Sequence, residues 1–182
     1  MNTMSLSMSR REATTAEVTT RTARSSTAAR TIAWGTLVVA ALDMAECQLY
    51  YINLPFLALY RGVARGLLGD AARTGGLSAA LLGALLHLFI CFVIVLTYYE
   101  ASKRIPALAR RPVVWGLAYG VWVFAFMNYV VVPLSAAGSF DRLPLSIPFL
   151  LNGIIGQPLV VGLPAALFAR RALAGSTLDP HR

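Results

Sequence analysis

The chain has 182 residues, of which 57% are hydrophobic and 13% charged, and its mean hydropathy is +0.64. A soluble domain of this length needs more charge to cover its surface, and the apolar residues cluster in four long runs. Fold class is therefore expected to be all-α, as a four-helix transmembrane bundle. The net charge of +8 does not indicate nucleic-acid binding, because the basic residues flank the apolar runs and form no basic face.

Residues 1–30 are rich in Ser, Thr, Arg and Ala and have no apolar periodicity. This composition predicts a disordered cytoplasmic tail. A signal peptide is a poorer interpretation, because the first apolar run starts late and contains acids. The first span is placed at about 31–54, and Pro55 ends or kinks it.

The segment after Pro55 has a different character from the spans. Phe56, Tyr60, Val63 and Leu67 share one helical face, and arginines lie on the opposite face. This pattern predicts a short helix in the membrane interface, ended by the glycines from Gly69 onward.

Three further spans complete the predicted membrane domain, which covers 31–172 and precedes a short cytoplasmic tail over 173–182. They are placed at about 77–99, 112–134 and 146–169. With the N-terminus inside, the cytoplasmic segments hold 12 Lys and Arg residues and the outer loops hold four. Positive residues favour the cytoplasmic side, so both termini are expected there.

Polar residues form a stripe inside the first span. Thr36, Asp43, Glu46, Cys47 and Tyr50 fall within one narrow arc of the helix. An ionised carboxylate in the middle of a membrane costs at least about 2.5 kcal/mol. The stripe must therefore face other helices or water, or the acids must stay protonated.

Counting 1.5 Å per residue from the helix ends places other polar groups at matching depths. His87 and Gln157 come out level with Asp43, and an Asp43–His87 contact is expected. A second layer nearer the outer face contains Glu46, Asn128 and Asn152.

These six residues make up the candidate proton or solute site. The leading hypothesis is transport or sensing of a proton or small solute, with Asp43 as the titrating group, His87 as its partner and Gln157 as a hydrogen-bond support. The alternative is a structural or assembly protein in which buried polar groups only fix helix packing.

Three other features have an ordinary structural explanation. Cys47 and Cys91 are expected to be small apolar fillers. Gly116 and Gly120 form a GxxxG motif, which is compatible with packing inside the bundle and with a homo-oligomer. Pro158 kinks the fourth span, as does Pro164, and such breaks line a cavity or only improve packing.

The motifs of common enzymes are missing from the sequence. It contains no HExxH, G-x-S-x-G or GK[ST] pattern, so no catalytic residue and no enzymatic activity are predicted. A single histidine within the spans excludes a bis-histidine haem. Asp43, Glu46 and His87 offer only three ligands at approximate depths, so no metal or other cofactor is predicted. The expected partner is the lipid bilayer.

Five stretches carry a resemblance to a known family: "GLLGDAARTGG", "LGALLHLF", "YYEASKRIP", "YGVWVFAFMNYVVVPLSA" and "LLNGIIGQPLVVGLPAALFARR". Together they resemble an uncharacterised family of bacterial four-span inner-membrane proteins, the YagU-like proteins. The resemblance implies a multi-pass inner-membrane location and supplies no activity. It carries over His87, Asn128 and Pro133 by motif. Relatives tend to have a histidine where this chain has Gln157, which argues against a two-histidine site here.

Overall fold

The computed structural model describes residues 3–50, 52–138 and 147–177, and this part of the chain is helical without any strand. The all-α fold class expected from the sequence is confirmed. In chain order, the elements are α1 (Thr3–Tyr50), α2 (Phe56–Leu68), α3 (Ala71–Thr74), α4 (Gly76–Arg104), α5 (Pro106–Arg110), α6 (Pro112–Phe126), the π-helical turn η1 (Met127–Val131), α7 (Val132–Leu134), α8 (Ile147–Leu151), the π-helical turns η3 (Asn152–Gly156) and η4 (Pro158–Gly162), and α9 (Leu163–Thr177).

Four helical stretches among the described residues are long and apolar enough to cross a membrane. They are Ser25–Tyr50, Gly76–Arg104, Pro112–Leu134 and Phe149–Gly175. Each corresponds to a predicted span, and the ends differ by no more than about two helical turns.

The first helix begins much earlier than the predicted span. A disordered tail was expected over 1–30, whereas α1 is helical from Thr3. Most of the residue types in this segment tolerate a helix. Once the span has formed, each further residue adds a hydrogen bond without a new nucleation step, so the helix can extend beyond the apolar run.

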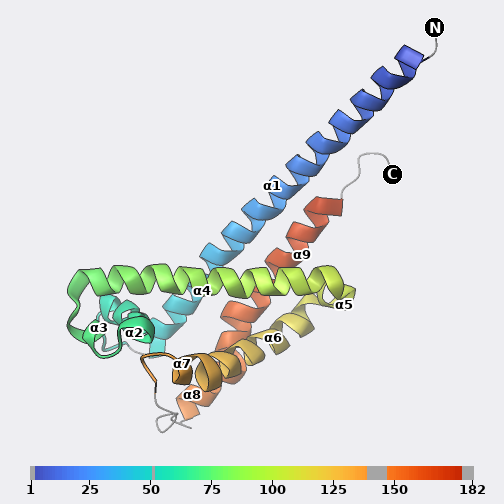
Figure 1. Ribbon diagram of the computed structural model, residues 1–182. Coiled ribbons are helices and arrows are strands. Elements are labelled where there is room, and N and C mark those ends of the chain that lie inside the picture. Colours follow the sequence, from blue (N-terminus) through green and yellow to red (C-terminus); the bar gives the residue numbers. More distant parts are fainter. Residues whose placement is uncertain (1–2, 51, 139–146, 178–182) are drawn as a thin grey trace.

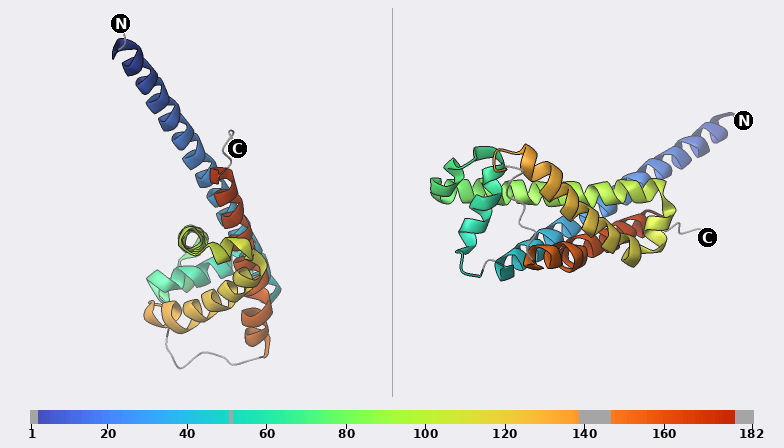
Figure 2. Two further views of the ribbon diagram at one scale, coloured as in Figure 1. Left: turned by 90° about the vertical axis from the view of Figure 1, so that its right-hand side faces the viewer. Right: turned by 90° about the horizontal axis from the view of Figure 1, so that it is seen from below.

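The spans alternate in direction, and both termini lie at the same end of the molecule (Figure 1). Helices α1 and α9 run antiparallel and side by side, and the N-terminal part of α1 projects beyond α9 (Figures 1 and 2). Helix α9 also contacts α4 and α6, so the last span touches the other three. The polar positions of α1 therefore face α4 and α9.

Helices α2 and α3 form an excursion between the first and second spans. Helix α2 ends at Leu68 and is capped by Gly69, whose φ of 59° lies in the left-handed region and whose amide donates to the Arg65 carbonyl. It packs on α4 at Gly83, where a Cβ atom would overlap the Tyr60 carbonyl. In Figure 2, α2 crosses α4 steeply, so a membrane-spanning α4 places α2 along the membrane surface, as expected for the interfacial helix.

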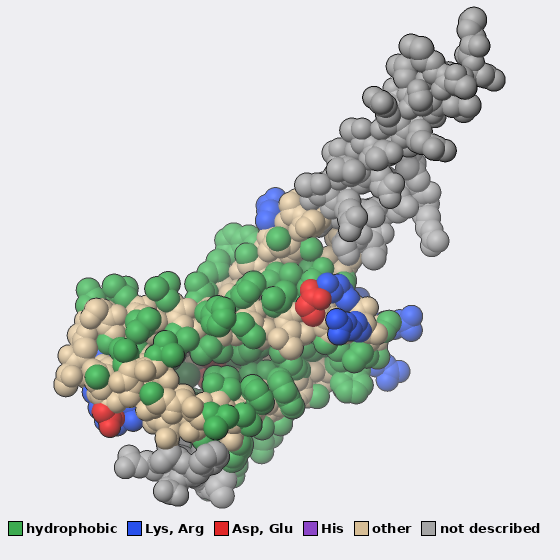
Figure 3. All heavy atoms as spheres, viewed as in Figure 1, with side chains coloured by type: hydrophobic (Ala, Val, Ile, Leu, Met, Phe, Trp, Pro, Cys, Tyr) green, Lys and Arg blue, Asp and Glu red, His purple; other side chains and the backbone are tan. Residues whose placement is uncertain are grey.

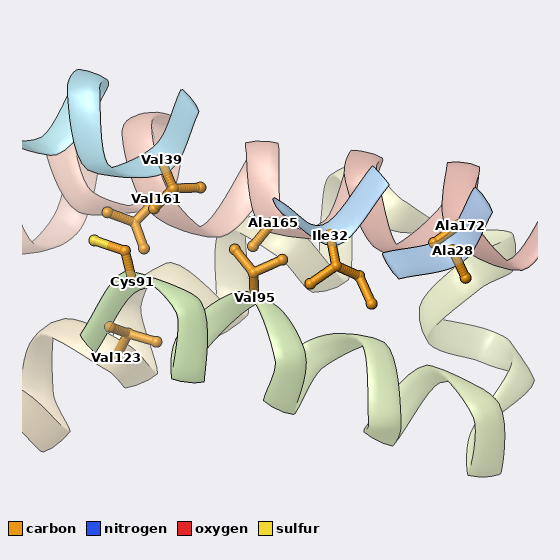
Figure 4. Packing of buried hydrophobic residues seen from close by; sticks show 9 residues of the cluster. All are labelled: Ala28, Ile32, Val39, Cys91, Val95, Val123, Val161, Ala165 and Ala172. Carbon is orange, nitrogen blue, oxygen red and sulfur yellow. The ribbon is translucent and has the colours of Figure 1, made fainter. Parts of the chain in front are cut away.

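Small side chains fill the centre of the bundle. A cluster from α1, α4, α6, η4 and α9 comprises Ala28, Ile32, Val39, Cys91, Val95, Val123, Val161, Ala165 and Ala172 (Figure 4). Large apolar side chains such as Leu85, Phe89 and Trp122 are exposed, and hydrophobic groups cover much of the face in Figure 3. Small residues inside and large ones outside are typical of packing in lipid.

The GxxxG glycines lie where α6 meets the fourth span. Gly116 and Gly120 are both buried. A Cβ atom at Gly116 would lie 2.8 Å from the Ala166 Cβ atom, and one at Gly120 would overlap the backbone at Pro158. The two glycines thus allow close packing within one chain.

The fourth span is irregular around its first proline. Two π-helical turns, η3 and η4, flank Gln157, and Pro158 begins the second of them. Proline has no amide hydrogen and obstructs the carbonyl four residues earlier, which disturbs the regular α-helical ladder. Such turns are frequent at functional sites, and here the two turns meet at Gln157.

Candidate functional site

The acidic stripe of α1 faces the interior of the bundle at its centre. Thr36 and Glu46 are buried, and Asp43 and Cys47 are half-buried. Tyr50, at the end of α1, is 41% exposed. Because α1 packs against α9 and α4, the acids lie among protein groups and away from the large apolar side chains that cover the outside.

Asp43 is held by side chains from two other spans. Its Oδ1 atom accepts a hydrogen bond of 2.5 Å from the Gln157 Nε2 atom, between η3 and η4. Its Oδ2 atom lies 3.8 Å from the Nδ1 atom of His87 on α4. The three residues at matching depth in the sequence therefore meet in space, and the contact between Asp43 and His87 is present.

His87 is buried, and its two ring nitrogens have different neighbours. The Nε2 atom lies 3.1 Å from the Ala40 carbonyl oxygen of α1. A carbonyl oxygen can only accept, so Nε2 carries a hydrogen and Nδ1 is the nitrogen that faces Asp43. The backbone of α1 thus orients the ring toward the acid one turn further along the same helix.

Cys91 completes this cluster and was not predicted as part of it. Its Sγ atom lies 3.7 Å from the His87 Nε2 atom, and its side chain is buried. Asp43, His87 and Cys91 each place a potential ligand atom within 4.8 Å of the other two. The spacing of His87 and Cys91, four residues apart on a helix, is the sequence signal that could have identified the pair.

Glu46 lies one turn beyond Asp43 and has an unusual environment. It is only 7% exposed, and neither carboxyl oxygen has a hydrogen-bond partner among the residues that the structure describes. The carboxylate packs against Gly156, where a Cβ atom would overlap its Oε1 atom. A buried carboxylate without a partner needs a proton or a cation nearby.

In the described part of the chain, no hydrogen bond joins Glu46 to the other two residues of the predicted second layer. Asn128 is half-buried, and its Nδ2 atom donates to the Phe124 carbonyl of its own helix. Asn152 is also half-buried, at the start of η3. Depth counting gave the height of each side chain, but α6 and the π-helical turns decide which way each one points.

The second free thiol of the described chain, Cys47, is half-buried on α1. It follows Glu46 directly and lies outside the group formed by Asp43, His87 and Cys91.

The site thus combines a carboxylate, an imidazole and a thiol from two spans with an amide from a third. Such a set can bind a proton or another small cation. Comparison of the chain with protein-family models, with curated proteins and with solved structures finds no match. The resemblance to the YagU-like family therefore stays a prediction.

Proposed function

We propose that this protein resides in a bacterial inner membrane, with both termini in the cytoplasm, and moves or senses a proton or another small solute at Asp43. The observation that carries the proposal is the contact of Asp43 with His87 and Gln157 from two other spans. Ionisable residues inside membrane spans are costly and are kept mainly where they serve a pathway or a binding site.

The distribution of charge supports the proposed orientation. The end of the bundle with both termini carries Arg30, Lys103, Arg104, Arg110, Arg111, Arg170 and Arg171. The opposite end carries fewer arginines, and two of them pair with Asp70: Arg73 at 3.0 Å and Arg65 at 3.1 Å. The hydrogen bond from Arg73 and the positive charge of the nearby Arg65 hold the pKa of Asp70 below its usual value. This acid therefore remains charged and offsets part of the positive charge at this end of the bundle.

Partial exposure of Asp43 supports a role beyond packing. Its side chain keeps 18% of its surface accessible, whereas that of His87 keeps 8%. If Asp43 served only to join helices, it would be expected to be completely buried, because hydrogen bonds between helices are strongest where the surroundings are apolar. An exchangeable ligand needs such access.

The experiment measures proton flux in vesicles that contain the purified protein and a trapped pH-sensitive dye. The wild type is expected to dissipate an imposed pH gradient at least tenfold faster than the Asp43→Asn variant. Asp70→Asn is the matched control, because Asp70 is an exposed acid outside the spans. Flux that is equal in the wild type and Asp43→Asn contradicts the proposal of proton movement.

The alternative, a structural or assembly role, has support in the same contacts. The Gln157–Asp43 hydrogen bond joins α1 to the fourth span as interhelical polar bonds commonly do. In that case Asp43→Asn changes the thermal stability or the oligomeric state in detergent, while vesicles show no protein-dependent flux.

A further inference from the structure

We propose that Asp43, His87 and Cys91 bind a divalent transition-metal ion of the zinc class. The three residues come from α1 and α4 and place one oxygen, one nitrogen and one sulfur ligand together inside the bundle. Zinc accepts this mixture of ligands in proteins, whereas magnesium and calcium prefer oxygen alone. The inference rests on the proposed function in one respect, namely that Asp43 holds a cation.

The ligand distances fit a tetrahedral ion with small adjustments. Bonds of about 2.0–2.3 Å to zinc place neighbouring ligands about 3.3–3.8 Å apart. The His87 Nδ1 atom lies 3.8 Å from the Asp43 Oδ2 atom, which is already the spacing of two zinc ligands. The 3.7 Å contact of the Cys91 Sγ atom is with Nε2, the ring nitrogen that does not face Asp43. One potential ligand atom from each residue lies within 4.8 Å of the other two, so closing the site on Nδ1 requires the Cys91 thiol to turn toward that nitrogen.

The orientation of the His87 ring is the one that metal ligation requires. Histidine ligands usually donate their second ring N–H to a carbonyl or carboxylate, which fixes the tautomer and the ring plane. Here, the His87 Nε2 atom donates to the Ala40 carbonyl, so the lone pair of Nδ1 remains for an ion beside Asp43.

Charge balance favours a divalent ion at this depth. On binding, Cys91 releases its thiol proton to water and coordinates as a thiolate, Asp43 coordinates as a carboxylate, and His87 coordinates as a neutral ring. The two negative ligands cancel the charge of the ion, which leaves a neutral group in a low-dielectric interior. Glu46, buried without a hydrogen-bond partner in the described part of the chain, lies one turn from Asp43 beside the site.

The test measures zinc binding by the full chain in detergent and needs no flux assay. Equilibrium dialysis followed by metal analysis is expected to give one zinc ion per chain. Cobalt(II) loading is expected to give the absorption band of cobalt–thiolate charge transfer. Cys91→Ser and His87→Gln are each expected to weaken zinc binding at least tenfold and to remove or displace that band.

The matched control is Cys47→Ser, which removes the other thiol of the membrane domain and lies outside the ligand group. It is expected to bind zinc like the wild type. A wild type without bound zinc, a cobalt spectrum without the thiolate band, or equal binding by wild type and Cys91→Ser overturns the inference. The last two outcomes leave an Asp43-dependent proton flux intact, whereas zinc binding without any flux overturns only the transport proposal.

Discussion

At the scale of single residues, Glu46 has an energetically costly environment. Its carboxylate is buried and has no hydrogen-bond partner in the described part of the chain, and Gly156 leaves just enough room for it. A group left unsatisfied in this way costs about 1–3 kcal/mol, and more when it is charged. Its persistence is consistent with a functional site beside Asp43, where local stability is often reduced.

Replacing Glu46 with Gln is expected to raise the free energy of unfolding by about 1 kcal/mol, because the amide has the same shape and no charge to desolvate. Thermal unfolding in detergent measures the change. Glu100→Gln is the control: Glu100 forms an exposed pair with Lys103 and is expected to shift stability by less than about 0.5 kcal/mol. A loss of stability in the Glu46→Gln variant would contradict the statement that the Glu46 carboxylate is buried without a hydrogen-bond partner.

Replacing Gly156 with Ala is expected to destabilise the protein by about 1 kcal/mol, the low end of the cost of overpacking, because the new Cβ atom overlaps only the end of the flexible Glu46 side chain. The double variant Gly156→Ala with Glu46→Ala removes this overlap and is expected to recover most of the loss. Additive effects in the double variant, measured by the same unfolding assay, show that the two residues do not touch.

The sequence predicts part of this site and misses part of it. Helical periodicity and depth brought Asp43, His87 and Gln157 together correctly, because straight spans keep side chains at calculable heights. The same method does not give rotation about the helix axis, and Asn128 donates to the Phe124 carbonyl of its own span, without a hydrogen bond to Glu46. Cys91 was missed because a buried cysteine in an apolar run is usually a filler, and its contact with His87 depends on rotamers.

At the scale of elements, the apolar runs predict the spans well but not where each helix stops. Helix α4 continues to Arg104, past the end of the predicted span. An ion pair of 2.6 Å between Lys103 and Glu100 supports this last turn, and Pro106 stops the helix just beyond it. Helix ends therefore follow local side-chain chemistry, which hydropathy does not measure.

Close packing of α6 on the fourth span gives a prediction for Gly120. Its replacement with Ala places a Cβ atom into the backbone at Pro158, so a loss of stability of about 1–3 kcal/mol is expected in thermal unfolding. Gly62→Ala on α2 is the matched control, because a Cβ atom there meets nothing within 4 Å. The control is expected to be neutral or slightly stabilising, and an equal loss in both variants contradicts close packing at Gly120.

At the scale of the whole molecule, the bundle is arranged for lipid. Small side chains lie inside, large apolar ones lie outside, and the exposed charged side chains gather at the two ends. The orientation in the membrane is then predicted from the arginines, which are more numerous at the end that carries both termini. Such an end usually faces the cytoplasm.

This orientation is testable with a reporter that is active only in the cytoplasm. Fused after Arg171 or inserted at Ile105, between α4 and α5, the reporter is expected to be active. Inserted at Gly75, between α3 and α4, it is expected to be silent. The opposite pattern shows that the termini lie outside.

The central claim is that Asp43 bonds across the bundle to a residue of another span, and a double-mutant cycle tests it most directly. The cycle uses Asp43→Asn, Gln157→Leu and the double variant, with the free energy of unfolding measured for all four proteins. A hydrogen bond to a carboxylate predicts a coupling energy of about 1.5–3 kcal/mol between the two positions. Additive effects, with no coupling energy, contradict the contact and with it the proposed site.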